Sequence, residues 1–197
     1  MKNKILSIAA ILLTTIMGLS CTKAVSKGEP MVKEEPKGEK MLIIYYSHSG
    51  ITKKVAQQIQ KLTGAALYEI TPETPYPSEY SEVVDQAKKE INAGYRPPLK
   101  GELPSIGAYD VVFIGSPNWW STIAPPVASL AEKLDFQGKI VAPFFTHGGG
   151  GLSNCDRDLK KVVKNGKVSA PLVLRDKRVS DNNSEVAAWL KELNLLK

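Results

Sequence analysis

The chain has 197 residues, a formal net charge of +6 and two cysteines, and 43% of its residues are hydrophobic. Its positive residues are scattered with no dense Lys/Arg run, which is typical of a solvated surface and argues against a nucleic-acid partner. The two histidines lie far apart in the sequence, and no group of His, Cys and Asp has metal-ligand spacing, so we expect no metal site.

The N-terminus has the pattern of an export signal. Lys2 and Lys4 precede an apolar stretch, residues 5–19, that ends in small residues before Cys21. This stretch is shorter than the roughly 18 residues of a membrane-spanning helix, so a cleaved secretory signal peptide at residues 1–20 is favoured over an uncleaved anchor. The Gly-Leu-Ser sequence before Cys21 is similar to a lipoprotein processing site, although Gly stands where Leu is usual. We therefore expect export in the unfolded state and a lipid on Cys21 that anchors the chain to a bacterial membrane, on the periplasmic or surface side.

The next segment, residues 21–40, is predicted to be a disordered tether. It consists mostly of Lys, Glu, Pro, Gly and Ser and cannot bury enough apolar surface to order itself. Its prolines and charges favour an extended spacer between membrane and domain, and a leader without a spacing role is the alternative. The remaining 157 residues, 41–197, suit one domain with a substantial core. Their net charge is about +3 once Lys2, Lys4 and the net +1 of residues 22–40 are set aside.

In this domain, strand-like apolar runs alternate with helical stretches. The strand-like runs are residues 42–46, 66–70, 111–114, 140–145 and 172–174. Helical spacing of apolar residues marks 53–62 and the segment around 186–193, and a further helix is predicted over about 79–92. The alternation predicts an α/β three-layer sandwich, in which a five-stranded parallel sheet has helices on both faces.

The turn after the first predicted strand has the composition of a phosphate-binding site. It contains Ser47, His48, Ser49, Gly50, Ile51 and Thr52. Backbone N–H groups at a helix start have no intrahelical partner and carry the positive end of the macrodipole. With three hydroxyls added, an anion can bind there without a lysine. An ordinary helix N-cap is the alternative interpretation.

Two further loops follow strands of their own. The second loop contains Ser116, Pro117, Asn118, Trp119 and Trp120, and the third contains Thr146, His147, Gly148, Gly149, Gly150 and Gly151. In an open parallel sheet, loops at the carboxyl ends of neighbouring strands meet in one crevice, where ligands usually bind. We therefore expect the three loops to form a single site.

Together, the three loops resemble the flavodoxin family, and in particular its single-domain bacterial members with a Tyr-Ser-x-Ser/Thr-Gly start. The resemblance covers about residues 41–197 and implies a flavodoxin-like fold with an FMN site. It places the FMN phosphate in the first loop, where the backbone amides of residues 48–52 and the hydroxyls of Ser47, Ser49 and Thr52 hold it. Ile51 departs from the Asn that this family commonly has at its position.

The same resemblance assigns the second loop to the isoalloxazine ring. Pro117 and Asn118 are expected to run beside the ring edge. Adjacent residues at a strand end tend to face opposite ways, so we expect one of Trp119 and Trp120 to stack on the ring and the other to pack in the core. Core packing of both tryptophans is the alternative.

The third loop is expected to bring the amides of residues 148–151 to the flavin and His147 to its pyrimidine carbonyls, where a donor favours the reduced form. A flexible turn before a helix from Leu152 is the alternative use of the glycines. Since this loop offers no aromatic cover, we expect one open ring face, which suits a small substrate such as a quinone.

Two features lie outside the three loops. Tyr76, Tyr80 and Tyr95 belong to the long connection between the second and third strands and are candidate contacts to substrate or flavin. The stretch 94–100 in that connection either leans over the site or is a plain surface loop. Cys155 lies near a predicted helix start, which favours a thiolate, but a buried apolar role is the stronger expectation.

The hypothesis that follows is an exported FMN protein for electron transfer or flavin-dependent reduction, with a redox partner protein or a small quinone-like acceptor. The chemistry then resides in the flavin, and no catalytic acid–base residue is required. The mild basicity weakens electrostatic docking on a basic redox partner. The alternative is a membrane-tethered binding module on a flavodoxin scaffold without flavin, since export in the unfolded state leaves the cytoplasmic FMN pool behind.

Overall fold

The sheet of this protein is parallel throughout its main path. The computed structural model describes residues 39–196, so the predicted signal peptide, Cys21 and most of the predicted tether lie outside the described residues. The main strands are β1 (Met41–Tyr45), β2 (Ala66–Glu69), β3 (Val111–Trp119), β5 (Ile140–His147) and β7 (Leu172–Arg175). Their order is β2-β1-β3-β5-β7, the flavodoxin-like doubly wound order. The predicted fold class is therefore confirmed.

Two short strands were not predicted. β6 (Lys167–Val168) pairs with the start of β5, so β6 and β7 follow one another along the same edge of that strand. β4 (Thr122–Ile123) pairs antiparallel with the end of β3. Runs of two residues are too short to give a periodic signal, which is why the sequence indicated five strands where the sheet has seven.

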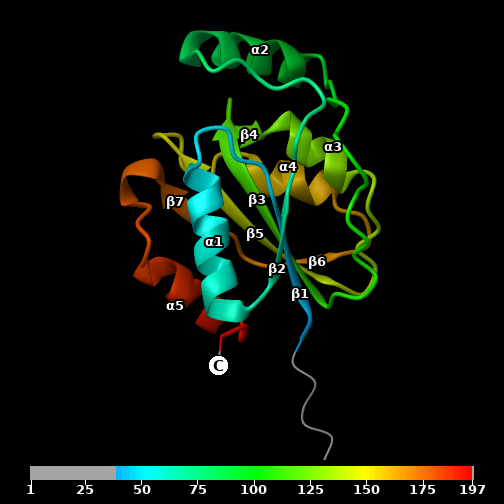
Figure 1. Ribbon diagram of the computed structural model, residues 1–197, viewed down its shortest axis with the longest axis vertical. Helices are drawn as coiled ribbons and strands as arrows, with labels where there is room; N and C mark the ends of the chain where they lie inside the picture. The colour runs from blue at the N-terminus through cyan, green and yellow to red at the C-terminus, as the bar shows by residue number, and fades with distance from the viewer. Residues whose placement is uncertain (1–38, 197) are drawn as a thin grey trace, which may run out of the picture. The chain divides into compact units, whose positions relative to one another are not determined.

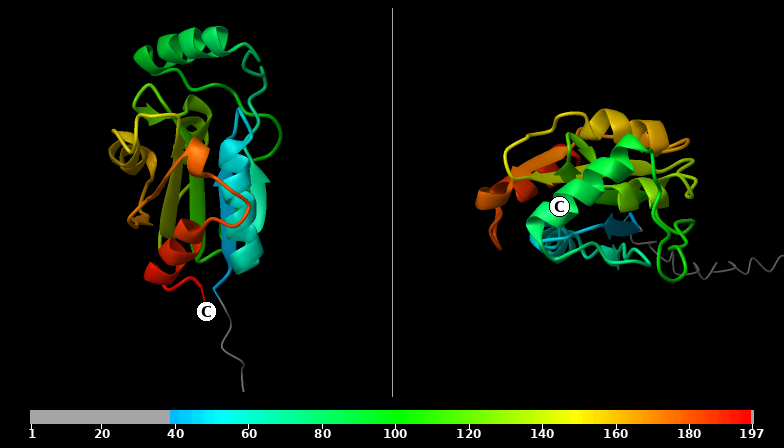
Figure 2. Two further views of the ribbon diagram at one scale, coloured as in Figure 1. Left: turned by 90° about the vertical axis from the view of Figure 1, so that its left-hand side faces the viewer. Right: turned by 90° about the horizontal axis from the view of Figure 1, so that it is seen from above.

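Helices cover both faces of the sheet (Figures 1 and 2). α1 (Ile51–Thr63) and α5 (Ser184–Glu192) lie on one face, and α3 (Pro125–Ala131) and α4 (Cys155–Val162) lie on the other. The alternation along β1 shows the reason. Ile43 and Tyr45 belong to the core on the α1 side, and Leu42 and Ile44 belong to the core on the opposite side.

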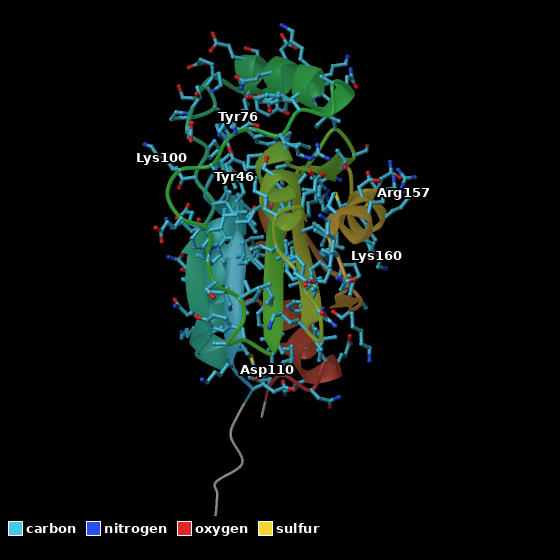
Figure 3. The ribbon with its side chains drawn as sticks, turned by 90° about the vertical axis from the view of Figure 1, so that its right-hand side faces the viewer. Tyr46, Tyr76, Lys100, Asp110, Arg157 and Lys160 are labelled. Carbon is cyan, nitrogen blue, oxygen red and sulfur yellow. The ribbon has the colours of Figure 1, made fainter. Side chains whose placement is uncertain are left out.

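The helix predicted over about 79–92 forms as α2 (Tyr80–Asn92), but it does not lie on a sheet face. It crosses above the carboxyl ends of the strands (Figure 1), and its buried residues are Val83 and Ala87. Tyr46 and Tyr76 lie between the strand ends and α2 (Figure 3). At the opposite end of the molecule, the backbone N–H of Lys40 donates to Asp110 Oδ2 over 2.9 Å.

β3 and β5 run further than the sequence predicted, and this changes the second loop. β3 was expected to end at Ile114 but continues to Trp119, paired with β5 as far as Pro117 opposite Thr146. Gly115 permits this close pairing, because a Cβ there would lie 2.2 Å from Phe144 Cζ. The second loop is therefore mostly strand, and it ends in a tight hairpin with β4.

None of the helices within residues 39–196 is long and apolar enough to cross a membrane.

Candidate functional site

A cavity of about 650 Å³ lies at the carboxyl edge of the sheet, within the size range of small-molecule sites. All three predicted loops contribute to it, together with α2 and the residue that follows β7. The lining residues are His48, Ser49, Ile51, Tyr80, Val83, Val84, Ala87, Pro117, Asn118, Trp119, Trp120, Thr146, His147, Gly148 and Asp176.

The first loop presents free backbone donors at the start of α1. Gly50 is the N-cap residue of the helix, in the left-handed conformation at φ 83°, and has no side chain that could accept a hydrogen bond from the helix end. Among the described residues, the backbone N–H groups of residues 48–52 have no acceptor, whereas the N–H of Lys53 donates to Ser47 Oγ over 3.2 Å. Unpartnered donors at the positive end of a helix dipole can bind an anion. The lining contains no Lys or Arg, so the attraction comes from the backbone.

Thr52 does not face the cavity. Its side chain is buried, and its Oγ1 lies 2.8 Å from Thr146 Oγ1. This hydrogen bond joins the first loop to the end of β5, on which the third loop begins. Ser47 is likewise absent from the lining, because its Oγ accepts the Lys53 N–H. Of the three hydroxyl residues predicted to hold a phosphate, only Ser49 lines the cavity.

The two tryptophans of the second loop face different surroundings, and both line the cavity. Trp119 packs edge-on against Tyr46 and Tyr76, with ring centroids 5.5 and 5.0 Å away. Trp120 is 48% exposed, and its indole N–H donates to the carbonyl oxygen of Val84 in α2 over 2.9 Å. Trp119 therefore extends the aromatic core to the cavity, and Trp120 connects the hairpin to α2.

The aromatic core under Trp119 is uncharged. The Tyr76 hydroxyl donates to Glu90 Oε2. Burial, with this hydrogen bond and the charge of Glu90 as smaller causes, raises the pKa of Tyr76 well above its usual value. Burial raises the pKa of Tyr46 in the same way. Both phenols thus stay protonated and support Trp119 by packing.

The third loop supplies one unpaired polar atom. Nδ1 of His147 is buried without a hydrogen-bond partner among the described residues, although the His147 ring lines the cavity. Gly148 is the only one of the four glycines in the lining, and Asn118 Nδ2 donates to the carbonyl oxygen of Gly151 over 2.8 Å. The Asn118 amide was expected beside the edge of the isoalloxazine ring. Its hydrogen bond also joins the third loop to the second.

The structure brings ten of the sixteen predicted site residues into the cavity lining. The residues that lie outside it are Ser47, Gly50, Thr52, Gly149, Gly150 and Gly151. Prediction from sequence missed Asp176, Val83, Val84 and Ala87, and it named Tyr80 only among three candidate tyrosines. Asp176 follows β7 directly, so the strand-end rule that found the loops could have found it. The α2 residues form an apolar stripe at positions 80, 83, 84 and 87, the α2 stripe. From the sequence, these positions were predicted to belong to a helix but not to line the site.

Cys155 lies outside the cavity lining. Its side chain is buried at the start of α4, and burial, with the charge of Asp158 as a smaller cause, raises the pKa of its thiol to about 12. The expectation of a buried apolar role is therefore confirmed, and the thiolate alternative is wrong because desolvation outweighs the helix terminus. In the described part of the chain, no group of three or more His, Cys, Asp or Glu residues could hold a metal ion.

Comparisons with known proteins place the chain among flavoproteins. A family model described as Flavodoxin matches residues 40–193. A candidate flavoprotein from Bacteroides eggerthii superposes with a TM-score of 0.70 at 30% identity, over 80% of this chain and 99% of that one. A flavoprotein from Lactobacillus acidophilus, solved in complex with FMN, superposes with a TM-score of 0.61 at 28% identity, over 77% of this chain and 99% of that one. The comparison with curated proteins gave no match.

Proposed function

The chain belongs to the flavodoxin family, and from this membership we propose that it is an FMN-binding protein for electron transfer or flavin-dependent reduction. The observation that carries the proposal is the row of unpartnered backbone N–H groups in residues 48–52 at the start of α1. A phosphate monoester is doubly charged near neutral pH and accepts several hydrogen bonds, so it matches this donor set.

The rest of the cavity fits the other parts of FMN. Trp119 and Pro117 give it apolar walls that a flat ring system can contact. The unpaired, buried Nδ1 of His147 offers a polar contact to a ligand, and a buried polar atom without a partner is costly unless a ligand or water satisfies it. The residues present therefore fit the cofactor.

In the bound protein, FMN supplies the redox chemistry and the chain binds, orients and shields it. The amides of residues 48–52 and the Ser49 hydroxyl would hold the phosphate. Trp119 is fixed by Tyr46 and Tyr76, so it would contact the ring with little loss of side-chain freedom. His147 stands at the third loop, where hydrogen bonding to the ring tunes its electron affinity.

The acceptor in this proposal is a redox partner protein or a small quinone-like molecule, and the chain acts outside the cytoplasm on a lipid anchor at Cys21. The mildly basic domain gives no support for docking on a basic partner, which favours the small acceptor. Mass spectrometry of the N-terminal peptide tests the anchor: a diacylglyceryl mass on Cys21 is expected, and an unmodified Met1 would overturn this part.

The experiment that tests the cofactor is the absorption spectrum of the protein isolated from its native membrane. A yellow protein that releases FMN on denaturation is expected, and dithionite should bleach it reversibly. A colourless protein would favour the alternative function, a flavin-free binding module on the same scaffold. Material from a cytoplasmic expression host is a weaker test because it meets abundant FMN during folding.

A further inference from the structure

One wall of the cavity is an apolar face of α2, of which Val83 and Ala87 are buried and Tyr80 is exposed. Tyr80, Val83, Val84 and Ala87 all line the cavity and belong to α2. Their spacing of three, one and three residues puts them on one face of the helix, a stripe that in most surface helices packs on the core. Figure 2 shows α2 crossing the carboxyl ends of the strands. The stripe lines the cavity there, together with residues of the three loops.

The hairpin between β3 and β4 supplies the facing aromatic group. Trp120 and Ser121 form its two-residue turn, both at positive φ, 50° and 67°. Such turns favour Asn and Gly, and bulky residues rarely adopt this conformation. Strained backbone of this kind persists where the surroundings over-determine it, and it clusters at functional sites.

Two contacts fix the Trp120 indole. Its N–H donates to the carbonyl oxygen of Val84, and Lys88 Nζ lies 4.6 Å from the centre of its ring. Lys88 itself is not part of the cavity lining. The indole is thus held in place beside the α2 stripe, and the two present aromatic and aliphatic surface to the cavity.

The two halves of the cavity differ in the charge of their lining residues. Asp176 is the only carboxylate in it and lies beside the third loop, where its Oδ2 is 3.8 Å from the position of a Cβ built on Gly148. The free amides lie at the first loop. The α2 half contains no charged side chain in its lining, so it favours an uncharged, flat ligand over an anion or a cation.

We propose that Tyr80, Val83, Val84, Ala87 and Trp120 form a subsite, the α2 subsite, for a small uncharged aromatic acceptor such as a quinone lying against the flavin. This inference rests on the proposed function and adds where the acceptor binds and which residues select it. With FMN bound and reduced by an external two-electron donor, the flavin would supply a hydride and solvent a proton, which together convert the quinone to a hydroquinone. The role of the α2 subsite would be to hold the quinone against the ring.

The test uses the whole chain loaded with FMN and three variants. Tyr80→Ala removes an aromatic ring that is 80% exposed, so the fold should tolerate it, and Trp120→Ala removes the facing indole. Tyr95→Ala is the matched control, because Tyr95 is also an exposed tyrosine, 48%, but lies outside the cavity lining. Each protein is reduced with one equivalent of dithionite and mixed with menadione or with ferricyanide in a stopped-flow instrument.

We expect Tyr80→Ala and Trp120→Ala to raise the half-saturating menadione concentration by about tenfold, the size of a lost aromatic contact. Ferricyanide is a trianion, which an uncharged apolar subsite does not bind. The rate at which it oxidises the reduced flavin should therefore not change in either variant. A readout without turnover is the change in flavin absorbance when 1,4-dimethoxynaphthalene, which cannot be reduced, binds to the oxidised protein. That change should weaken in both variants and persist in Tyr95→Ala.

The FMN dissociation constant separates the failure of this subsite from failure of the proposed function. Unchanged FMN binding with unchanged menadione constants would overturn the subsite alone. A loss of FMN affinity in parallel with menadione would also overturn it, because the α2 stripe would then belong to the flavin site itself. A wild-type protein that binds no FMN would remove the proposed function and this subsite together.

Discussion

The hydrogen bond between Thr52 and Thr146 allows a quantitative test of how the first loop is joined to the third. The two hydroxyl oxygens lie 2.8 Å apart, and both side chains are buried, at 2% and 4% exposure. Thr52→Val or Thr146→Val alone leaves the remaining hydroxyl buried without a partner, which costs about 1–3 kcal/mol. For a domain of this size, each kcal/mol lowers Tm by about 2–4 °C.

The double variant removes both hydroxyls and keeps the side-chain volumes. It should therefore be less destabilised than the sum of the single variants, with a coupling free energy of about 0.5–3 kcal/mol. Urea unfolding of the four proteins measures this cycle, and Thr71→Val, an exposed threonine on another segment, is the control. Additive single-variant losses, equal to the loss in the double variant within about 0.5 kcal/mol, would refute the reasoning.

Three further predictions follow from particular contacts. Gly115→Ala should lower the free energy of unfolding by about 1–3 kcal/mol or more because the new Cβ would lie 2.2 Å from Phe144 Cζ, while Gly107→Ala, with open space around it, should be nearly neutral in urea unfolding. In a Cys21→Ser variant, the Cys155 thiol, whose pKa burial raises from 9.0 to about 12, should resist Ellman's reagent at pH 8 until the protein unfolds. On raising the pH, the thiol ionises first in the unfolded chain. Burial of the neutral thiol therefore contributes fully to the free energy of unfolding below pH 9, and this contribution declines toward pH 12. Rapid labelling of the folded protein would show that the thiol is accessible. Trp120→Phe and Trp189→Phe each delete an indole hydrogen bond, but only the first should accelerate hydrogen exchange in α2, because the Trp189 N–H donates to Ala170 on the far side of the domain. Equal exchange in both variants would mean that Trp120 does not hold α2.

The first strand and its loop were predictable because their signals are local. An apolar run, a hydroxyl-rich turn and a helical period follow one another between residues 41 and 63, and each depends only on near neighbours in the sequence. The extension of β3 was not predictable on this basis. Gly115, Pro117 and Asn118 are poor strand formers, and only pairing with β5 and β4 holds them extended.

The site shows a second kind of limit. A buried threonine and a ligand-binding threonine look identical in sequence, and the partner of Thr52 is 94 positions away in the chain. Likewise, the stripe on α2 predicts an apolar environment but not whether a sheet or a cavity provides it. Three-dimensional arrangement decides both questions, which is why the loops were found while the α2 wall and the burial of Thr52 were missed.

The most direct test of the central claim is a comparison of FMN with riboflavin, which lacks the phosphate, in a fluorescence-quenching titration of the flavin-free protein. If the free amides of residues 48–52 hold the phosphate, each charge-assisted hydrogen bond contributes about 1.5–3 kcal/mol. Two such bonds make FMN bind at least about a hundredfold more tightly than riboflavin. Equal affinities would contradict the assignment of the phosphate to the amides of residues 48–52. Binding of neither flavin would contradict the assignment of this cavity to FMN.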